Sequence, residues 1–172
     1  MNEQAFTGVR VLDFSQVLAG PFATQLMAQL GAQVIKVEQP VGGDMTRGLM
    51  SASSDGMAPS FLTANLGKRS LTLDLKNPKA KEVVHKLVAE ADVLVENFKP
   101  GTIERLGFGF DAMKAIKPDL VYASISGFGQ TGPRANLPAF DGAIQAYSGM
   151  MSISGHAETG PVRSGYFSVD MS

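Results

Sequence analysis

The first forty residues alternate between two hydrophobic patterns, and this alternation limits the fold more than any other feature. Val9–Phe14 is a short, mostly apolar run of the kind that forms a buried strand. Apolar side chains then recur at helical spacing between Pro21 and Leu30, and Gly31 suits the end of that helix. Gln33–Glu38 is expected to be the next strand. The order strand–helix–strand predicts two parallel strands joined by a crossover helix.

The same alternation continues to about residue 125. Further strands are expected at Ser70–Leu75, Asp92–Glu96 and Leu120–Ile125, and helices at 77–91, Thr102–Leu106, Asp111–Ile116 (capped by Asp111) and 143–151. The polar connection 40–67 is too long for an ordinary loop and is expected to have a function. The pattern predicts an α/β, Rossmann-like fold with a mostly parallel sheet and flanking helices, in one domain over residues 1–172.

Composition excludes several classes of protein. With 44% hydrophobic and 18% charged residues, the chain belongs with soluble globular domains. A net charge of −1 gives no reason to expect nucleic acid or a membrane as partner. No cysteine and only two histidines are present, so no metal site is expected. No signal pattern or apolar run of membrane-spanning length is seen, so a cytoplasmic location is expected.

Ligands of parallel α/β sheets bind beyond the carboxyl ends of the strands. The loops expected there are Ser15–Gly20, Glu38–Gly48, Asn97–Gly101 and Ser126–Pro133. The first loop has one glycine where a dinucleotide fingerprint has three, and Pro21 removes a backbone donor. A nicotinamide cofactor is therefore not expected.

Asp170 follows a stretch rich in Gly, Ser and Met, and a carboxylate in such a position can attack a thioester. Five segments in order resemble the class III CoA-transferases: Leu12–Pro21, Gly31–Glu38 with Gly43–Gly48, Gly67–Asp74, Val95–Gly101 and Ser126–Pro133. Members of that family are longer, so the resemblance covers the N-terminal part of the family fold. It implies an interlocked homodimer that takes acyl-CoA and a small carboxylic acid as substrates, without a tightly bound cofactor.

The resemblance also implies roles for individual residues. Asp170 falls on the family's catalytic aspartate, and Phe140 and Asp141 fall beside it in the substrate pocket. Residues implied to bind CoA are Gln16, Val17, Leu18, Ala19, Leu73, Asp74, Leu75, Lys76, Asn97, Phe98, Lys99 and Arg105. For Arg105 a phosphate contact is favoured over a surface ion pair with a neighbouring acidic residue. The identity of the donor and acceptor acids stays open.

Other charged residues allow two interpretations each. Lys68 and Arg69 form either an ordinary solvated face or a contact for CoA phosphates. Arg47 either orders its long loop or meets a substrate carboxylate. Glu38 and Glu96, at the ends of expected strands, are favoured as structural or loop-ordering groups.

The activity implied by the resemblance is transfer of CoA through covalent intermediates on Asp170. An alternative is the acyl-CoA racemase or epimerase branch of the same family, which places a histidine before the aspartate at the position of Asp141. Phe140 stands there and cannot transfer protons, so transfer is favoured. A third possibility is a non-catalytic, truncated CoA-binding fragment, because the family's glycine-rich flap would lie beyond Ser172.

Overall fold

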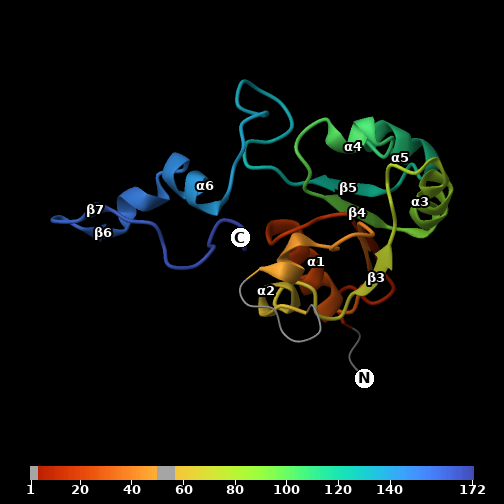
Figure 1. Cartoon of the computed structure of the whole chain (residues 1–172), viewed down its shortest axis with the longest axis horizontal. Coiled ribbons are helices and arrows are strands. Elements are labelled where there is room, and N and C mark those ends of the chain that lie inside the picture. Colours follow the sequence, from red (N-terminus) through yellow and green to blue (C-terminus); the bar gives the residue numbers. More distant parts are fainter. Residues whose placement is uncertain (1–3, 50–56) are drawn as a thin grey trace.

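A five-stranded sheet forms the centre of the protein, in a computed structural model that describes residues 4–49 and 57–172. All neighbouring strands are parallel and their order is β3-β2-β1-β4-β5 (Figure 1). The strands are β1 (Arg10–Asp13), β2 (Gln33–Glu38), β3 (Arg69–Thr72), β4 (Val93–Glu96) and β5 (Val121–Ser124). This arrangement confirms the predicted α/β class.

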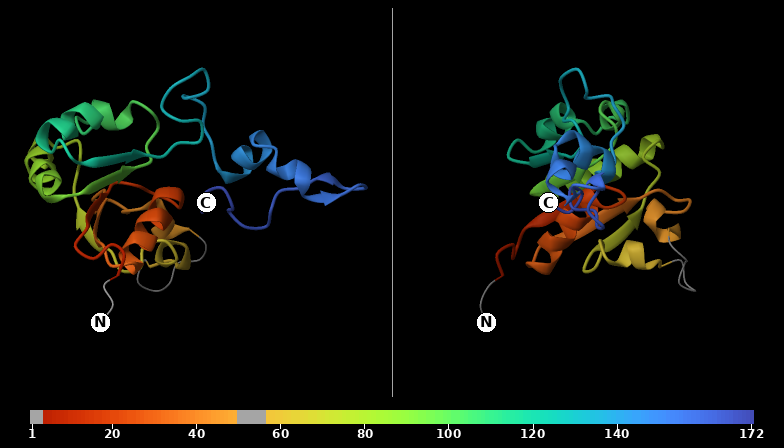
Figure 2. Two further views of the ribbon diagram at one scale, coloured as in Figure 1. Left: turned by 180° about the vertical axis from the view of Figure 1, so that it is seen from behind. Right: turned by 90° about the vertical axis from the view of Figure 1, so that its left-hand side faces the viewer.

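Helices cover both faces of the sheet. They are α1 (Ala19–Gln29), the 3₁₀ turn η1 (Met45–Gly48), α2 (Pro59–Leu62), α3 (Pro78–Glu90), α4 (Thr102–Arg105) and α5 (Phe110–Ile116). The helices α3, α4 and α5 lie on one side and α1 on the other, as the views in Figures 1 and 2 show. Among the described residues, no helix is long and apolar enough to cross a membrane.

Strand alternation divides the core into two layers. Leu12 and Leu94 point to one face, where they pack with Val84 and Val88 of α3, and all four side chains are at most 1% exposed. Val11 points to the opposite face and joins a smaller cluster against α1. Burial on both faces explains why the central strands β1 and β4 contain consecutive apolar residues.

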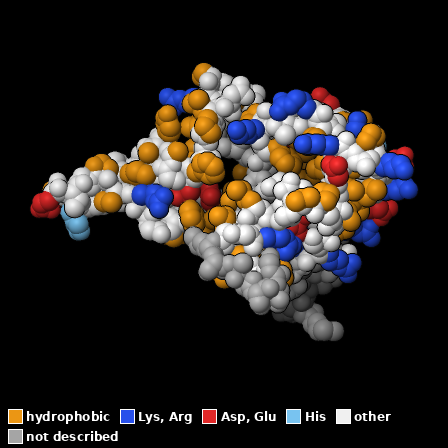
Figure 3. Space-filling view, in the orientation of Figure 1, with side chains coloured by type: hydrophobic (Ala, Val, Ile, Leu, Met, Phe, Trp, Pro, Cys, Tyr) orange, Lys and Arg blue, Asp and Glu red, His pale blue; other side chains and the backbone are white. Residues whose placement is uncertain are grey.

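After β5 the chain leaves the sheet and forms a C-terminal arm, residues 125–172 (Figure 1). The arm contains α6 (Asp141–Tyr147), the 3₁₀ turn η2 (Met150–Ile153) and a small antiparallel hairpin of β6 (Gly155–His156) and β7 (Gly160–Pro161). The hairpin lies at the tip, and the last residues return toward the body (Figures 1 and 2). Phe140 is 76% and Ile153 87% exposed, and hydrophobic side chains are spread along the arm in Figure 3.

Several predicted boundaries were wrong, for local reasons. β3 ends at Thr72 rather than at residue 75 because Thr72 pairs with Glu38, where its neighbour β2 ends. The single helix expected at 143–151 is interrupted at Gly149, whose φ of 80° is left-handed. Asp111 does not cap α5, which begins one residue earlier after Gly109. The arm hairpin was not predicted.

The long connection 40–67 contains the short helices η1 and α2, which the sequence pattern did not predict. Residues 50–56 of this connection lie outside the described residues.

A buried ion pair joins the end of β1 to the residue before β3. Lys68 Nζ lies 2.9 Å from Asp13 Oδ2, and both side chains are at most 2% exposed. Lys68 also donates to the Pro21 carbonyl at 2.8 Å, and Thr24 Oγ1 donates to Asp13 at 2.7 Å. Although burial opposes its ionisation, Asp13 keeps a pKa below the usual value because two lysines and two hydroxyls stabilise the carboxylate. Both sequence-based interpretations of Lys68 are therefore wrong, since it is neither solvated nor free to meet a phosphate.

Replacing Asp13 by alanine should destabilise the fold strongly, because it leaves the Lys68 ammonium buried without its counter-charge. The expected loss in the free energy of unfolding is about 3–5 kcal/mol. Urea denaturation followed by circular dichroism measures it. The matched control is Glu90→Gln, which removes an exposed partner of Arg10 and should change stability by less than about 1 kcal/mol. Equal effects of the two substitutions would contradict this assignment.

Candidate functional site

The connections of the sheet diverge between its neighbouring strands β1 and β4, the position where α/β sheets bind ligands. The loops that follow these two strands are joined there by one side chain. Asn97 Oδ1 accepts from the Gln16 amide at 2.8 Å, and its Nδ2 donates to the Gln16 carbonyl at 2.7 Å. Asn97 thus fixes the first loop across the sheet rather than simply closing its own turn.

The residues on either side of Gln16, Ser15 and Val17, are bound by side chains from β2 and from the loop that follows it. The Ser15 carbonyl accepts from Lys36 Nζ at 2.7 Å, and the Val17 amide donates to Asp44 Oδ1 at 3.3 Å. Asp44 Oδ2 has no hydrogen bond of good geometry, but it lies 2.9 Å from Lys36 Nζ and forms a buried ion pair. Three consecutive loop residues are therefore fixed by separate partners.

Val17 has a φ of 69°, the only positive φ of a non-glycine residue in the part of the chain that the structure describes. This conformation is unfavourable for a β-branched side chain and persists only where the surroundings enforce it. The contacts of Ser15, Gln16 and Val17 supply that enforcement. Such strain is typical of a functional loop.

The loop after β2 is ordered by a second charged network. Arg47 Nε and Nη2 each lie 2.7 Å from a different oxygen of Glu38, and Ser70 and the Asp44 amide donate to the same carboxylate. The Arg47 guanidinium also stacks 3.7 Å from the centre of the Phe61 ring. Burial alone would raise the pKa of Glu38, but these hydrogen bonds lower it to about 2. The structure therefore decides between the two interpretations of Arg47, which orders its loop.

Glu96 is also a loop-ordering group, as predicted. Its carboxylate accepts from the Phe98 amide at 2.9 Å and fixes the turn after β4. Burial raises its pKa, although hydrogen bonds from Ser124 and Phe98 oppose this.

Asp170 faces a cavity of about 280 Å³ between the arm and the first loop. The cavity brings together six of the residues implicated by the sequence: Val17, Leu18, Ala19, Asn97, Phe140 and Asp170. These residues come from three distant parts of the chain.

Asp141 positions the backbone at Asp170. Its side chain is buried, and Oδ1 accepts from the amides of Val169 at 2.8 Å and Asp170 at 3.3 Å. Gln145 Nε2 donates to the other oxygen at 2.5 Å. Within the described residues no hydrogen bond reaches the Asp170 carboxylate, whose pKa is raised by burial and by the negative charge of Asp141. The two carboxylates therefore differ, because both oxygens of Asp141 accept hydrogen bonds whereas the Asp170 carboxylate accepts none from the described residues.

A second cavity of about 440 Å³ lies beyond the ends of β2 and β3. It gathers six further predicted residues: Gln16, Leu73, Asp74, Leu75, Lys76 and Phe98. Lys99 and Arg105 are exposed and line neither cavity. Arg105 donates to Thr102 Oγ1 at 2.9 Å and forms no ion pair with Glu104 or Asp111.

Sequence reasoning missed the groups that support the site. Lys36 lies between the apolar residues Ile35 and Val37 of a mostly buried strand, and a lysine in such a position needs a buried acceptor. That signal could have led to Asp44, six residues beyond the end of the strand. Gln145, which bonds Asp141, gave no comparable signal because a helix presents many such polar residues.

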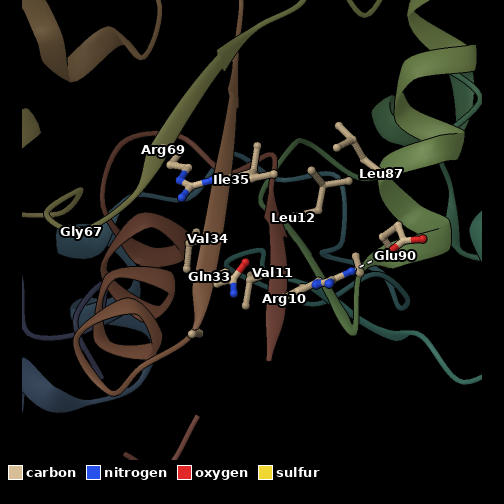
Figure 4. A pocket seen from close by; sticks show the side chains of 12 residues that line it. Arg10, Val11, Leu12, Gln33, Val34, Ile35, Gly67, Arg69, Leu87 and Glu90 are labelled. Carbon is tan, nitrogen blue, oxygen red and sulfur yellow. Dashed lines mark hydrogen bonds and ion pairs between the residues drawn. The ribbon is translucent and has the colours of Figure 1, made fainter. Parts of the chain in front are cut away.

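A further cavity, of about 390 Å³, lies at the amino ends of the strands, away from the loops that contain the candidate site. It is lined by the starts of β1, β2 and β3 and by α3, with Arg10 and Glu90 paired beside it (Figure 4). None of the predicted site residues lines it. In the described part of the chain, no cluster of three or more His, Asp or Glu side chains could hold a metal ion.

Comparison with known sequences identifies the family. The sequence profile of CoA-transferase family III matches residues 6–172, so the chain belongs to this family. It is 42% identical to a succinate–glutarate CoA-transferase of Agrobacterium fabrum over 96% of this chain and 43% of that protein. It is 44% identical to a formyl-CoA:oxalate CoA-transferase of Streptomyces coelicolor over 96% of this chain and 40% of that protein.

Solved structures show the same relationship. A CAIB/BAIF family protein from Brucella suis aligns with a TM-score of 0.93 and 40% identity, over 99% of this chain and 46% of that one. The chain therefore has the fold of the N-terminal part of such proteins. It spans about two fifths of the length of the curated relatives named above.

The Glu38 network should make stability sensitive to acid. The folded pKa of Glu38, about 2, lies below its ordinary value of 4.5, so its contribution to stability is complete above pH 4.5 and is lost as the pH falls through 2. We expect protonation of Glu38 over that pH interval to lower the free energy of unfolding by roughly 2–3 kcal/mol. Glu38→Gln should be less stable at pH 7 and should lose less on acidification, measured by urea denaturation at several pH values. Identical pH dependence in both proteins would refute the assignment.

Proposed function

We propose that this chain carries the catalytic aspartate and part of the CoA site of an enzyme that transfers CoA from a donor acyl-CoA to an acceptor carboxylic acid. The observation that carries the proposal is the free, half-buried Asp170 carboxylate in a cavity shared with the strained first loop. Membership of CoA-transferase family III supports it.

In the proposed mechanism the Asp170 carboxylate attacks the donor thioester, which forms a mixed anhydride and expels CoA thiolate. The thiolate attacks the aspartyl carbonyl, which gives an aspartyl-CoA thioester and releases the donor acid. The acceptor carboxylate then attacks this thioester, forming a second anhydride and freeing the thiolate. Attack of the thiolate on the acceptor carbonyl yields the new acyl-CoA and restores Asp170.

Each attack creates an oxyanion that needs donors. Leu18 and Ala19, which precede and begin α1, line the Asp170 cavity, and their amides have no hydrogen-bond partner among the described residues. Backbone amides at a helix start are suited to stabilise negative charge. We assign them this role, with Asn97 positioning them through Gln16.

We assign the second cavity to CoA itself, because Leu73, Asp74, Leu75 and Lys76 line it together with Gln16 and Phe98. Gln16 joins the two cavities, since its backbone is bound by Asn97 beside Asp170. A ligand lying across both would place its thioester near Asp170 and its remote end near β3. Lys99 and Arg105, exposed outside both cavities, are proposed to meet CoA phosphates.

Racemisation is not favoured, because Phe140, at the position of the branch's histidine, has no group that transfers a proton. Binding of CoA without catalysis is the second candidate, since the chain spans only about two fifths of its curated relatives. We also propose that a second copy covers the apolar surface of the arm, as large exposed apolar patches mark interfaces.

Trapping of the covalent intermediate tests the proposal. The complete gene product is incubated with a panel of acyl-CoAs and quenched with hydroxylamine, and peptides are analysed by mass spectrometry. A hydroxamate on Asp170 that depends on acyl-CoA is expected, and none in Asp170→Asn. CoA binding without any adduct would reject transfer in favour of the binding-only alternative.

The pH profile should depend on Asp141. Asp170 must be ionised to attack, and burial and the Asp141 charge raise its pKa, so activity should fall as the pH drops through this raised value. Asp141→Asn removes the charge and should move the acidic limb of kcat/KM to lower pH. An unchanged acidic limb together with a lower kcat/KM would mean that Asp141 acts only through its hydrogen bonds.

A further inference from the structure

An apolar cavity of about 480 Å³ lies on the other side of Val17 and Leu18, and Asp170 lines it as well. Its remaining lining comes from the connection 40–67, including Thr46, Ser60 and Thr63, and from the arm, including Asp141, Gly142 and Arg163. Because Asp170 belongs to both cavities, an acyl group bound at its carboxylate could extend into this one.

Most polar groups of this cavity are already committed. Ser60 donates to the carbonyls of Thr46 and Leu49, and Thr63 donates to the Ser60 carbonyl. The Thr46 hydroxyl donates to Asp44 Oδ1 at 2.7 Å. Asp141, whose two oxygens accept from backbone amides and from Gln145, is equally occupied. These groups offer little to an incoming polar ligand.

Arg163 is the exception. Arg163 is exposed, and in the described residues its guanidinium has no hydrogen-bond or ion-pair partner, although it lines an otherwise mostly apolar cavity. It packs against the start of α6 because Gly142 has no side chain there. A Cβ at Gly142 would lie 3.2 Å from Arg163 Cδ and 3.4 Å from Nη1. The cavity thus contains two uncommitted charged groups, the Asp170 carboxylate and the Arg163 guanidinium.

We propose that Arg163 binds the remote carboxylate of a dicarboxylic acyl group while the other carboxyl end reacts at Asp170. This inference rests on the proposed CoA transfer and names the substrate class of that site. A guanidinium binds carboxylates through two parallel, charge-assisted hydrogen bonds. The apolar walls fit the methylene chain that joins the two carboxylates.

Charge supports the same assignment. Asp141 and Asp170 are both acidic, so an anionic acyl group entering between them would meet repulsion without a cation. Arg163, which belongs to the same arm as both acids, supplies that cation. An uncharged acyl group would gain nothing from it, and Arg163 therefore determines specificity rather than catalysis.

The test compares succinyl-CoA with butyryl-CoA, in which a methyl group replaces the remote carboxylate, as donors for the complete gene product. Arg163→Gln should lower kcat/KM for succinyl-CoA by about 30- to 100-fold, mainly through KM, as expected for lost charge-assisted hydrogen bonds. The kcat/KM for butyryl-CoA should change by less than about threefold. Arg163→Lys keeps the positive charge but cannot form the two parallel hydrogen bonds. Its kcat/KM for succinyl-CoA should lie between those of the wild type and Arg163→Gln.

The matched control is Arg134→Gln, which removes an arginine of the same arm that stacks on Tyr147 and lies outside the cavity. It should not change the preference between the two donors. Equal losses with both donors in Arg163→Gln, or no loss with either, would overturn the assignment of Arg163 and leave CoA transfer intact. No transfer and no Asp170 adduct in the wild type with either donor would refute the transfer itself, and the assignment with it.

Discussion

Two buried lysine–carboxylate pairs support the candidate site, and the geometry of the first loop depends on them. Lys68 and Asp13 join the end of β1 to the segment before β3, while Lys36 and Asp44 lie under Ser15 and Val17. Charges buried this deeply are tolerated only when each is paired and hydrogen-bonded. Because these partners are fixed by the sheet, the loop keeps a backbone conformation at Val17 that a valine would not adopt freely.

The arm completes the site from the opposite side. It leaves the sheet after β5, extends to the hairpin and returns toward the body (Figure 1), and Asp170 lines a cavity together with the loop after β1. Asp141 fixes the return by binding two consecutive amides at the end of the arm. The sheet therefore positions the loop at the start of α1, and the arm positions the carboxylate, with the cavities between them.

Local patterns were sufficient for the sheet, because short strand-like segments such as Val9–Phe14 alternate with periodic helices. The resemblance brought Asp170 and the first loop together as candidates, and their roles remain predictions. Lys68 shows the limit of the sequence, because a basic residue beside Arg69 reads as surface until its long-range partner Asp13 is known. Contacts between distant segments leave no such local pattern.

Transfer of an oxygen atom to Asp170 would test the central claim most directly. The complete gene product, first converted to its aspartyl-CoA form, would undergo a single turnover with an acceptor acid labelled with ¹⁸O in its carboxylate. The mass of the peptide that contains Asp170 would then be measured by mass spectrometry. In the proposed mechanism one acceptor oxygen bridges the anhydride and stays on Asp170 when the thiolate attacks the acceptor carbonyl. The account predicts one ¹⁸O atom in that peptide, and an unlabelled peptide despite formation of the new acyl-CoA would contradict it.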